Sequence, residues 1–299
     1  MTPHTHIHPS FPFRHSRGLS FQSHARRVTK EESGNPGFII LFFLLFATFV
    51  SGCSAKLEQN NVLKVNVGTE VQNLDPHLVS GVPEQRVLNA LFEGLADLDP
   101  QTLQPIPAVA ESWTISEDKL VYTFTLRRNA RWSNGDPFTA NDFVYSWKRM
   151  LSPGLAAEYA YLLYCLKNGK LFNEGKITDF AQVGVKALDD YTLQVTLEHP
   201  TPYFLAMQVH EAWFPVHQAT IERFGKMDDR DTQWTRAGNF VGNGPFKLAE
   251  WWPNEVIRTV RSDSYWNKES VPLDGIEFYP IDNLQTEERS FRAGELHIT

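Results

Sequence analysis

Two pairs of adjacent aspartates and two histidines are the side chains of this sequence best suited to chemistry. The pairs are Asp189-Asp190 and Asp228-Asp229, while His210 and His217 flank Trp213-Phe214-Pro215. Paired carboxylates can share acid–base work, and imidazoles ligate metals or carry protons. Each aspartate pair lies in a polar stretch where aspartate favours turn geometry, and the histidines match no metal-binding motif. We therefore interpret the aspartates as turn residues and His210 as a half-buried imidazole.

Motifs for catalysis are missing from the sequence. It contains no G-x-S-x-G, H-E-x-x-H, phosphate-loop or G-x-G-x-x-G pattern. Gly242 and Gly244 are interpreted as turn glycines, and Cys165, in an apolar stretch, as a buried small hydrophobe. We predict no enzyme activity, no cofactor and no metal site. An envelope peptidase is the alternative enzyme class, and it would need a nucleophile or metal cluster that these motifs do not supply.

The segment that ends at residue 53 is interpreted as a lipoprotein signal. The uncharged, mostly apolar run 37–50 is too short to span a bilayer, but it fits the core of a secretory signal. Val50-Ser51-Gly52-Cys53 follows and resembles a bacterial lipobox. Cleavage would remove the leader, residues 1–52, and leave Cys53 acylated at the start of the mature protein. An ordinary signal with a chance cysteine is the alternative.

The charge of the remaining chain argues against nucleic-acid binding. Residues 1–52 hold five of the 28 basic and two of the 35 acidic residues, which leaves 23 basic against 33 acidic, a net charge of −10. A nucleic-acid partner needs a basic surface. The 247 residues from 53 to 299 are enough for one large or two modest domains.

Apolar periodicity predicts a mixture of helices and antiparallel hairpins. Thr139 and Asp142 have the spacing of a capping box, and Pro83 is well placed in the first turn of another helix. We predict an α/β fold without internal repeats. The expected strands are 62–67, 122–127, a hairpin of 183–187 with 191–197, and a strand pair over 246–260; helical residues include 83–92, 140–151 and 221–224; breaks fall at 74–76 and 243–245.

An ordered string of motifs resembles the oligopeptide-binding proteins of bacterial ABC importers, extracellular solute-binding family 5. The resemblance covers residues 62–299. The motifs are Val71-Gln-Asn-Leu-Asp-Pro-His77, Leu91-Phe-Glu-Gly-Leu95, Pro107-Ala-Val-Ala-Glu-Ser-Trp113, Tyr122-Thr-Phe-Thr-Leu-Arg127, Trp132-Ser-Asn-Gly135, Thr139-Ala-Asn-Asp-Phe-Val-Tyr-Ser-Trp147 and Asn243-Gly244-Pro245.

The resemblance implies a two-lobed, type II-like clamshell of the periplasmic-binding-protein class. Residues 53–92 would begin the first lobe, 93–217 would form an inserted small lobe, and 218–299 would return to the first lobe. The sequence stops in what looks like a continuing helix-to-strand passage, whereas family members continue for about as many residues again. The resemblance therefore implies that the chain is a fragment, the result of an early stop codon or a pseudogene product. It would lack the other large lobe and the aspartate that anchors the ligand, and would therefore bind peptides weakly.

The function implied by the resemblance is that of a monomeric, lipid-anchored, periplasmic or cell-envelope receptor that captures extended oligopeptides for an ABC permease. Pairing with a peptide backbone as an added strand gives affinity without reading side chains. By analogy with the family, Ser80, Gly81 and Val82 would offer main-chain groups to the ligand, and Tyr159 and His210 would line the cleft. The acidic residue usual at position 80 is replaced by serine. A murein-peptide or dipeptide receptor, and a structural lipoprotein, are the alternatives.

Overall fold

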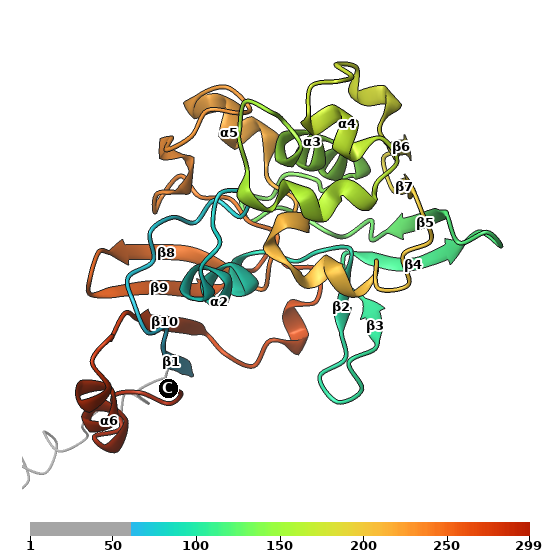
Figure 1. Ribbon diagram of the computed structural model, residues 1–299. Helices are drawn as coiled ribbons and strands as arrows, with labels where there is room; N and C mark the ends of the chain where they lie inside the picture. The colour runs from blue at the N-terminus through green and yellow to red at the C-terminus, as the bar shows by residue number, and fades with distance from the viewer. Residues whose placement is uncertain (1–60) are drawn as a thin grey trace, which may run out of the picture. The chain divides into compact units, whose positions relative to one another are not determined.

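Two four-stranded sheets organise residues 61–299, the part of the chain that the computed structural model describes (Figure 1). The predicted leader and Cys53 lie outside the described residues. In the first sheet β1 runs parallel to β10 and the other pairs are antiparallel, while every pair in the second sheet is antiparallel. The first sheet has the order β1 (Val62–Asn66), β10 (Gly275–Tyr279), β9 (Val256–Arg261), β8 (Phe246–Trp252); the second has the order β4 (Ala110–Ile115), β5 (Val121–Leu126), β7 (Thr192–Thr196), β6 (Val185–Asp189); β2 (Ala96–Leu98) and β3 (Pro105–Pro107) form a separate hairpin.

Helices cover both sheets, so the predicted α/β class is confirmed. Helix α2 packs beside β8 and α3 packs beside β6 (Figure 1). No helix within residues 61–299 has the length and apolar character needed to cross a bilayer. The α-helices are α2 (Val82–Leu91), α3 (Ala140–Met150), α4 (Gly169–Asn173), α5 (Gln218–Phe224) and α6 (Leu284–Arg292); the 3-10 helices are η2 (Glu158–Cys165), η3 (Phe180–Gln182), η4 (Ala206–Val209), η5 (Glu211–Trp213), η6 (Gln233–Thr235) and η7 (Lys268–Ser270).

The helix starts follow the predicted local chemistry. Pro83 lies in the first turn of α2, where a missing N–H costs nothing. At α3 the predicted capping box is present, and the Asp142 carboxylate accepts the backbone N–H of Thr139 at 2.7 Å. Burial raises the pKa of Asp142 to about 6.

The predicted strands and hairpins are confirmed with small shifts. Alternate residues of β5, beginning with Tyr122 and Phe124, are buried, as expected for a strand with one face on a core. In the β6–β7 hairpin Asp189 ends β6, and its carboxylate accepts the N–H of Tyr191 at 2.8 Å. The β8–β9 turn falls at the predicted position, and Asn254 adopts a left-handed conformation there with φ 62°.

An aromatic chain connects α3 to the segment that carries His210. Phe143 and Trp147 of α3 lie 5.6 Å apart, Trp147 meets Trp213 edge-on at 5.1 Å, and Trp213 meets Phe204 at 5.5 Å. All four rings are fully buried. The two pairs that Trp213 makes are edge-to-face, and such pairs add about 0.5–1.5 kcal/mol each beyond their buried area. These aromatic contacts therefore hold the segment around His210 against α3.

Gly242 and Gly244 are not turn glycines, and that prediction is wrong. The segment they occupy lies against the end of α2, where the N–H of Gly244 donates to the carbonyl of Leu91 at 2.9 Å. A Cβ on Gly244 would lie 2.5 Å from the carbonyl carbon of Leu91. Glycine is required here by close approach of two backbones, not by a left-handed φ.

The predicted lobe boundaries near residues 92 and 217 stay a prediction. Each large sheet takes its strands from one side of these boundaries, since 110–196 supplies the second sheet, and 62–66 with 246–279 supplies the first. One apolar core, however, runs under both sheets.

Candidate functional site

Three of the five predicted site residues form the entry to α2. Gly81 is the N-cap of α2 with extended φ and ψ of −93° and 146°, and Val82 is the first helical residue. The extended backbone of this segment therefore ends at Gly81, and Val82 begins the helix. Val82 remains exposed, at 59%. The N–H groups of the first helical turn lack carbonyl partners within a helix, and the Val82 N–H donates no hydrogen bond within residues 61–299.

The Glu84 side chain packs over Gly81. Its buried carboxylate accepts the N–H of Gln72 at 2.8 Å and lies directly over Gly81. A Cβ on Gly81 would collide with that carboxylate. The backbone between Ser80 and Val82 is thus held against the first turn of α2.

Tyr159 joins this backbone to His210. Its hydroxyl donates to the carbonyl of Ser80 at 3.4 Å, and its ring meets the imidazole of His210 edge-on at 5.0 Å. Desolvation, with the nearby Glu211 carboxylate, raises the pKa of Tyr159, so its hydroxyl stays a neutral donor. The structure therefore brings all five predicted residues together.

Two further residues, Gln85 and Glu211, complete a closed circle of contacts with Ser80, Tyr159 and His210. We call these five residues the ring. The amide of Gln85 donates to Glu211 Oε2 at 3.1 Å, and the same oxygen lies 3.4 Å from His210 Nδ1. His210 Nδ1 accepts the N–H of Ala212 at 3.2 Å and so caps η5. Sequence reasoning missed both residues, although a glutamate inside the apolar stretch 209–216 was an available signal.

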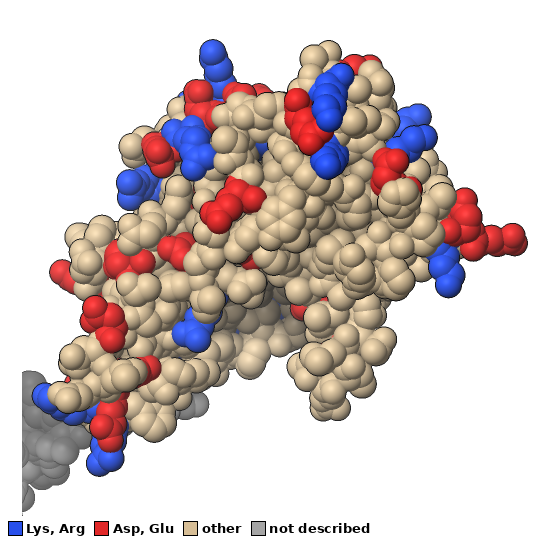
Figure 2. Space-filling model, in the orientation of Figure 1, with Lys and Arg blue, Asp and Glu red and all other residues tan. Residues whose placement is uncertain are grey.

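The surface over this ring is largely apolar and carries few charges. Val82 and Tyr161 are exposed beside it, and Tyr203 is exposed on the same connecting segment as His210. Figure 2 shows few Lys, Arg, Asp or Glu side chains across the middle of the face on which α2 and the 3-10 helices after residue 158 lie toward the viewer. Such a face suits a ligand bound through backbone groups and aromatic contacts.

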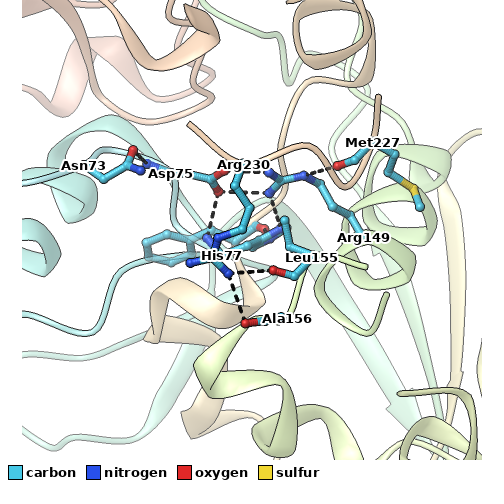
Figure 3. A network of polar contacts seen from close by, with 9 residues as sticks. Asn73, Asp75, His77, Arg149, Leu155, Ala156, Met227 and Arg230 are labelled. Atoms are coloured by element: carbon cyan, nitrogen blue, oxygen red, sulfur yellow. Dashed lines mark hydrogen bonds and ion pairs between the residues drawn. The ribbon is translucent and has the colours of Figure 1, made fainter. Parts of the chain in front are cut away.

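A buried ionic network anchors the two chain segments that carry the ring (Figure 3). Arg149 of α3 bonds Asp75 through both carboxylate oxygens, at 2.9 and 2.6 Å, and its Nε donates to the carbonyl of Met227 at 2.7 Å. Arg149 is also 3.0 Å from His77 Nδ1, and His77 Nε2 is 3.1 Å from the carbonyl of Phe214. The network therefore holds residue 77, just before Ser80, and residue 214, just after His210.

The proton positions in this network follow from the partners. A guanidinium can only donate, so His77 Nδ1 must accept and its Nε2 must carry the proton that bonds Phe214. Burial and the charge of Arg149 lower the pKa of His77 to about 4, which keeps the ring neutral. Burial alone would raise the pKa of Asp75, but the charge and hydrogen bonds of Arg149 hold it below its ordinary value.

The half-buried carboxylate of Glu93 lies at a small cavity near the end of α2. Glu93 accepts hydrogen bonds from the Tyr265 hydroxyl at 2.5 Å and from Trp266 Nε1 at 2.7 Å, and Arg127 stacks 3.6 Å from the centre of the Trp266 ring. Burial raises the pKa of Glu93 to about 7. The cavity measures about 200 Å³ and is also lined by Asp97.

The other residues considered for chemistry have structural surroundings. Asp229 accepts the N–H of Lys226 at 2.7 Å in a turn, as predicted for the aspartate pairs. His217 bonds the Thr220 hydroxyl at 2.7 Å and lies 3.1 Å from Asp136. Cys165 is partly buried against the core, and burial raises the pKa of its thiol to about 12.

Comparisons with known proteins agree with this geometry. Residues 104–299 match the family described as bacterial extracellular solute-binding proteins, family 5 Middle. The chain is 45% identical to the periplasmic oligopeptide-binding protein OppA of Escherichia coli over 81% of this chain and 44% of that protein. It is 42% identical to the dipeptide-binding protein DppE of Bacillus subtilis over 81% of this chain and 43% of that protein. The chain thus spans less than half the length of these relatives.

Solved structures show the same fold. The Haemophilus influenzae OppA complex with the peptide RPPGFSPFR superposes with a TM-score of 0.74 and 38% identity, covering 80% of this chain and 45% of that chain. The murein tripeptide binding protein MppA of Escherichia coli superposes with a TM-score of 0.74 and 34% identity, covering 80% and 45%. The predicted fold class, part of a periplasmic-binding-protein clamshell, is confirmed.

Proposed function

The chain belongs to family 5 of the bacterial extracellular solute-binding proteins, and we propose on this basis that it binds extended peptides in the cell envelope for delivery to an ABC importer. The observation that carries the proposal is the ring of Ser80, Tyr159, His210, Glu211 and Gln85 under a face with few charged side chains. These residues supply backbone groups, an aromatic surface and an imidazole, which suit a main chain better than a particular side chain.

The backbone beside α2 provides both kinds of peptide-pairing group. The carbonyl of Ser80 accepts one long hydrogen bond from Tyr159 and keeps a second lone pair. The N–H of Val82, at the helix start, can donate to a peptide carbonyl. A peptide lying along residues 80–82 would therefore exchange main-chain hydrogen bonds as in strand addition, without a fixed side-chain requirement.

The same proposal includes attachment to the membrane through Cys53, a periplasmic location, a monomeric state and an ABC permease as partner. The lipobox-like Val50-Ser51-Gly52-Cys53 supports the anchor. Metabolic labelling with palmitate should mark the wild-type protein and leave Cys53→Ala unlabelled. Equal labelling of both would remove the anchor from the proposal.

Peptide binding can be tested by NMR titration, which detects weak as well as tight complexes. Adding a mixed pool of tri- and tetrapeptides should shift the amide signals of residues 80–82 and the His210 ring. Tyr159→Phe, which removes the hydroxyl bonded to Ser80, should weaken binding. Tyr191→Phe is the matched control, because that tyrosine lies in the β6–β7 turn and not on this face, and should bind as wild type.

Two results would contradict this proposal. Shifts confined to the first-sheet edge around β1 would move the site away from α2, and the absence of any shift would remove peptide binding. Murein tripeptide, used as a separate ligand, distinguishes a murein-peptide receptor from a general oligopeptide receptor. The family is one of solute-binding proteins, and an envelope peptidase would instead cleave the added peptides.

A further inference from the structure

His210 has an unusual set of neighbours for a residue on a binding face. Its Nδ1 accepts the N–H of Ala212 at 3.2 Å, and the carboxylate of Glu211 lies 3.4 Å from the same nitrogen. A histidine beside a carboxylate can have two opposite proton arrangements. If Nδ1 carries the proton and gives it to Glu211, Nε2 is an acceptor; if Nδ1 accepts, Nε2 is a donor.

The contacts of Glu211 favour the second arrangement. The carboxylate is only 2% exposed, and its Oε2 is already bonded by the Gln85 amide at 3.1 Å. The 3.4 Å approach to His210 lies beyond the usual range for a hydrogen bond to an imidazole N–H, whereas the Ala212 N–H points at Nδ1 with hydrogen-bond geometry. Ala212 is fully buried, so its N–H has no water to bond instead.

The remaining nitrogen of His210 faces outward. Within residues 61–299, Nε2 makes no hydrogen bond, and it is not one of the buried polar atoms that lack a partner. The side chain is 30% exposed. The edge of Tyr159 fixes the ring from the other side at 5.0 Å. A proton on Nε2 is thus presented at the surface of the site.

We infer that His210 is held in the tautomer that carries its proton on Nε2, because its Nδ1 accepts the Ala212 N–H of η5; we call this arrangement the lock. The Glu211–Gln85 contact supports it. In this tautomer the Nε2–H of His210 donates a hydrogen bond to a backbone carbonyl oxygen of the ligand. The contact of His210 with a peptide carbonyl rests on the proposed function. It means that a peptide N–H is rejected at this point, because it would face another donor.

Tautomers can be read directly in the full chain by long-range ¹H–¹⁵N NMR of histidine, without any ligand. The expected spectrum for His210 has a pyrrole-type Nε2 and a pyridine-type Nδ1. Glu211→Gln should keep this pattern, because the lock is the Ala212 N–H. A pyrrole-type Nδ1 in the wild type would overturn the inference, since Nε2 would then be an acceptor.

Two substitutions at position 210 separate the cap from the donor. His210→Asn keeps an acceptor for the Ala212 N–H, but its amide N–H group ends short of the position of Nε2, so it should weaken peptide binding by about 3- to 10-fold, the worth of one neutral hydrogen bond. His210→Gln reaches further and should retain more of the affinity. Unchanged binding by a folded His210→Asn protein would overturn the inference. Failure of the wild type to bind any peptide would overturn the proposed function. The tautomer of His210, measured without ligand, tests the lock independently of peptide binding.

Discussion

Arg149 and Asp75 form a two-pronged ion pair in the interior, although 74 positions separate them in the sequence. Arg149 is 0% exposed, and its other nitrogen contacts are the Met227 carbonyl and His77. An uncompensated buried charge is far more costly than a missing surface contact. This pair therefore decides whether α3 and the loop before α2 can close on each other.

Asp75→Asn should destabilise the protein by about 3–5 kcal/mol, because it leaves the Arg149 guanidinium buried without its counter-charge. Urea unfolding at neutral pH measures the change. Glu250→Gln is the matched control, since it breaks an exposed pair with Arg258 of the same 2.6 Å length. That substitution should cost less than about 1 kcal/mol. A similar loss of unfolding free energy in the two variants would show that the buried Arg149–Asp75 pair contributes no more to stability than an exposed pair.

Glu93→Gln should make the protein less sensitive to pH between about 4.5 and 7. The pKa of Glu93 is raised from 4.5 to about 7 by burial, so the folded state holds a proton that the unfolded state releases. Its contribution to stability is therefore present at pH below 4.5 and lost as pH rises to 7, by about 3 kcal/mol in total. Relative to wild type, the variant should gain stability from pH 5 to pH 8 in urea unfolding. A constant difference between the two proteins would contradict this.

Gly244→Ala should cost about 1–3 kcal/mol, the usual range for overpacking a filled site. The added carbon would lie 2.5 Å from the Leu91 carbonyl carbon and 2.6 Å from the Phe92 nitrogen, and backbone atoms cannot rotate away. Thermal unfolding should show the loss. A melting temperature equal to that of wild type would mean that the end of α2 moves aside freely.

Residues 93–217, prepared alone, test the predicted lobe boundary. This stretch keeps the second sheet and the Trp147–Trp213 contact but loses Asp75 and Met227, both partners of Arg149. We expect a cooperative melt, and we expect Arg149→Met to stabilise the isolated stretch while destabilising the full chain. The same sign of change in both proteins would contradict the lobe prediction.

Local features of the fold could be predicted from the sequence because neighbouring residues determine them. The capping pair Thr139 and Asp142, and the alternation of Tyr122 and Phe124, lie within one turn or one strand. Gly244 was misinterpreted because a glycine can serve either a left-handed turn or a close backbone approach, and nearby residues do not tell which.

The site could be predicted only in part. Ser80, Tyr159 and His210 came from family resemblance, since their proximity depends on folding across 130 positions. Gln85 and Glu211 were missed because a helix-surface glutamine and a glutamate next to a histidine carry no motif. The partner of Arg149 could not be predicted either, because its position on α3 gives no sign that a carboxylate 74 residues earlier lies opposite.

The parallel pairing of β1 with β10 has a consequence for how the molecule reaches its final state. A short turn joins β8 to β9, whereas Asn61, which precedes β1, bonds Asp274 across 213 positions. Each doubling of the length of a closed loop costs about 0.6 kcal/mol of chain entropy. Pairing β1 with β10 therefore costs about 3 kcal/mol more than forming the β8–β9 hairpin. The β8–β9–β10 meander should therefore nucleate first, and β1, the earliest strand within residues 61–299, should be the last to dock. Until it docks, the outer edge of β10 stays open to other strands, which is the interval in which a chaperone would protect this chain.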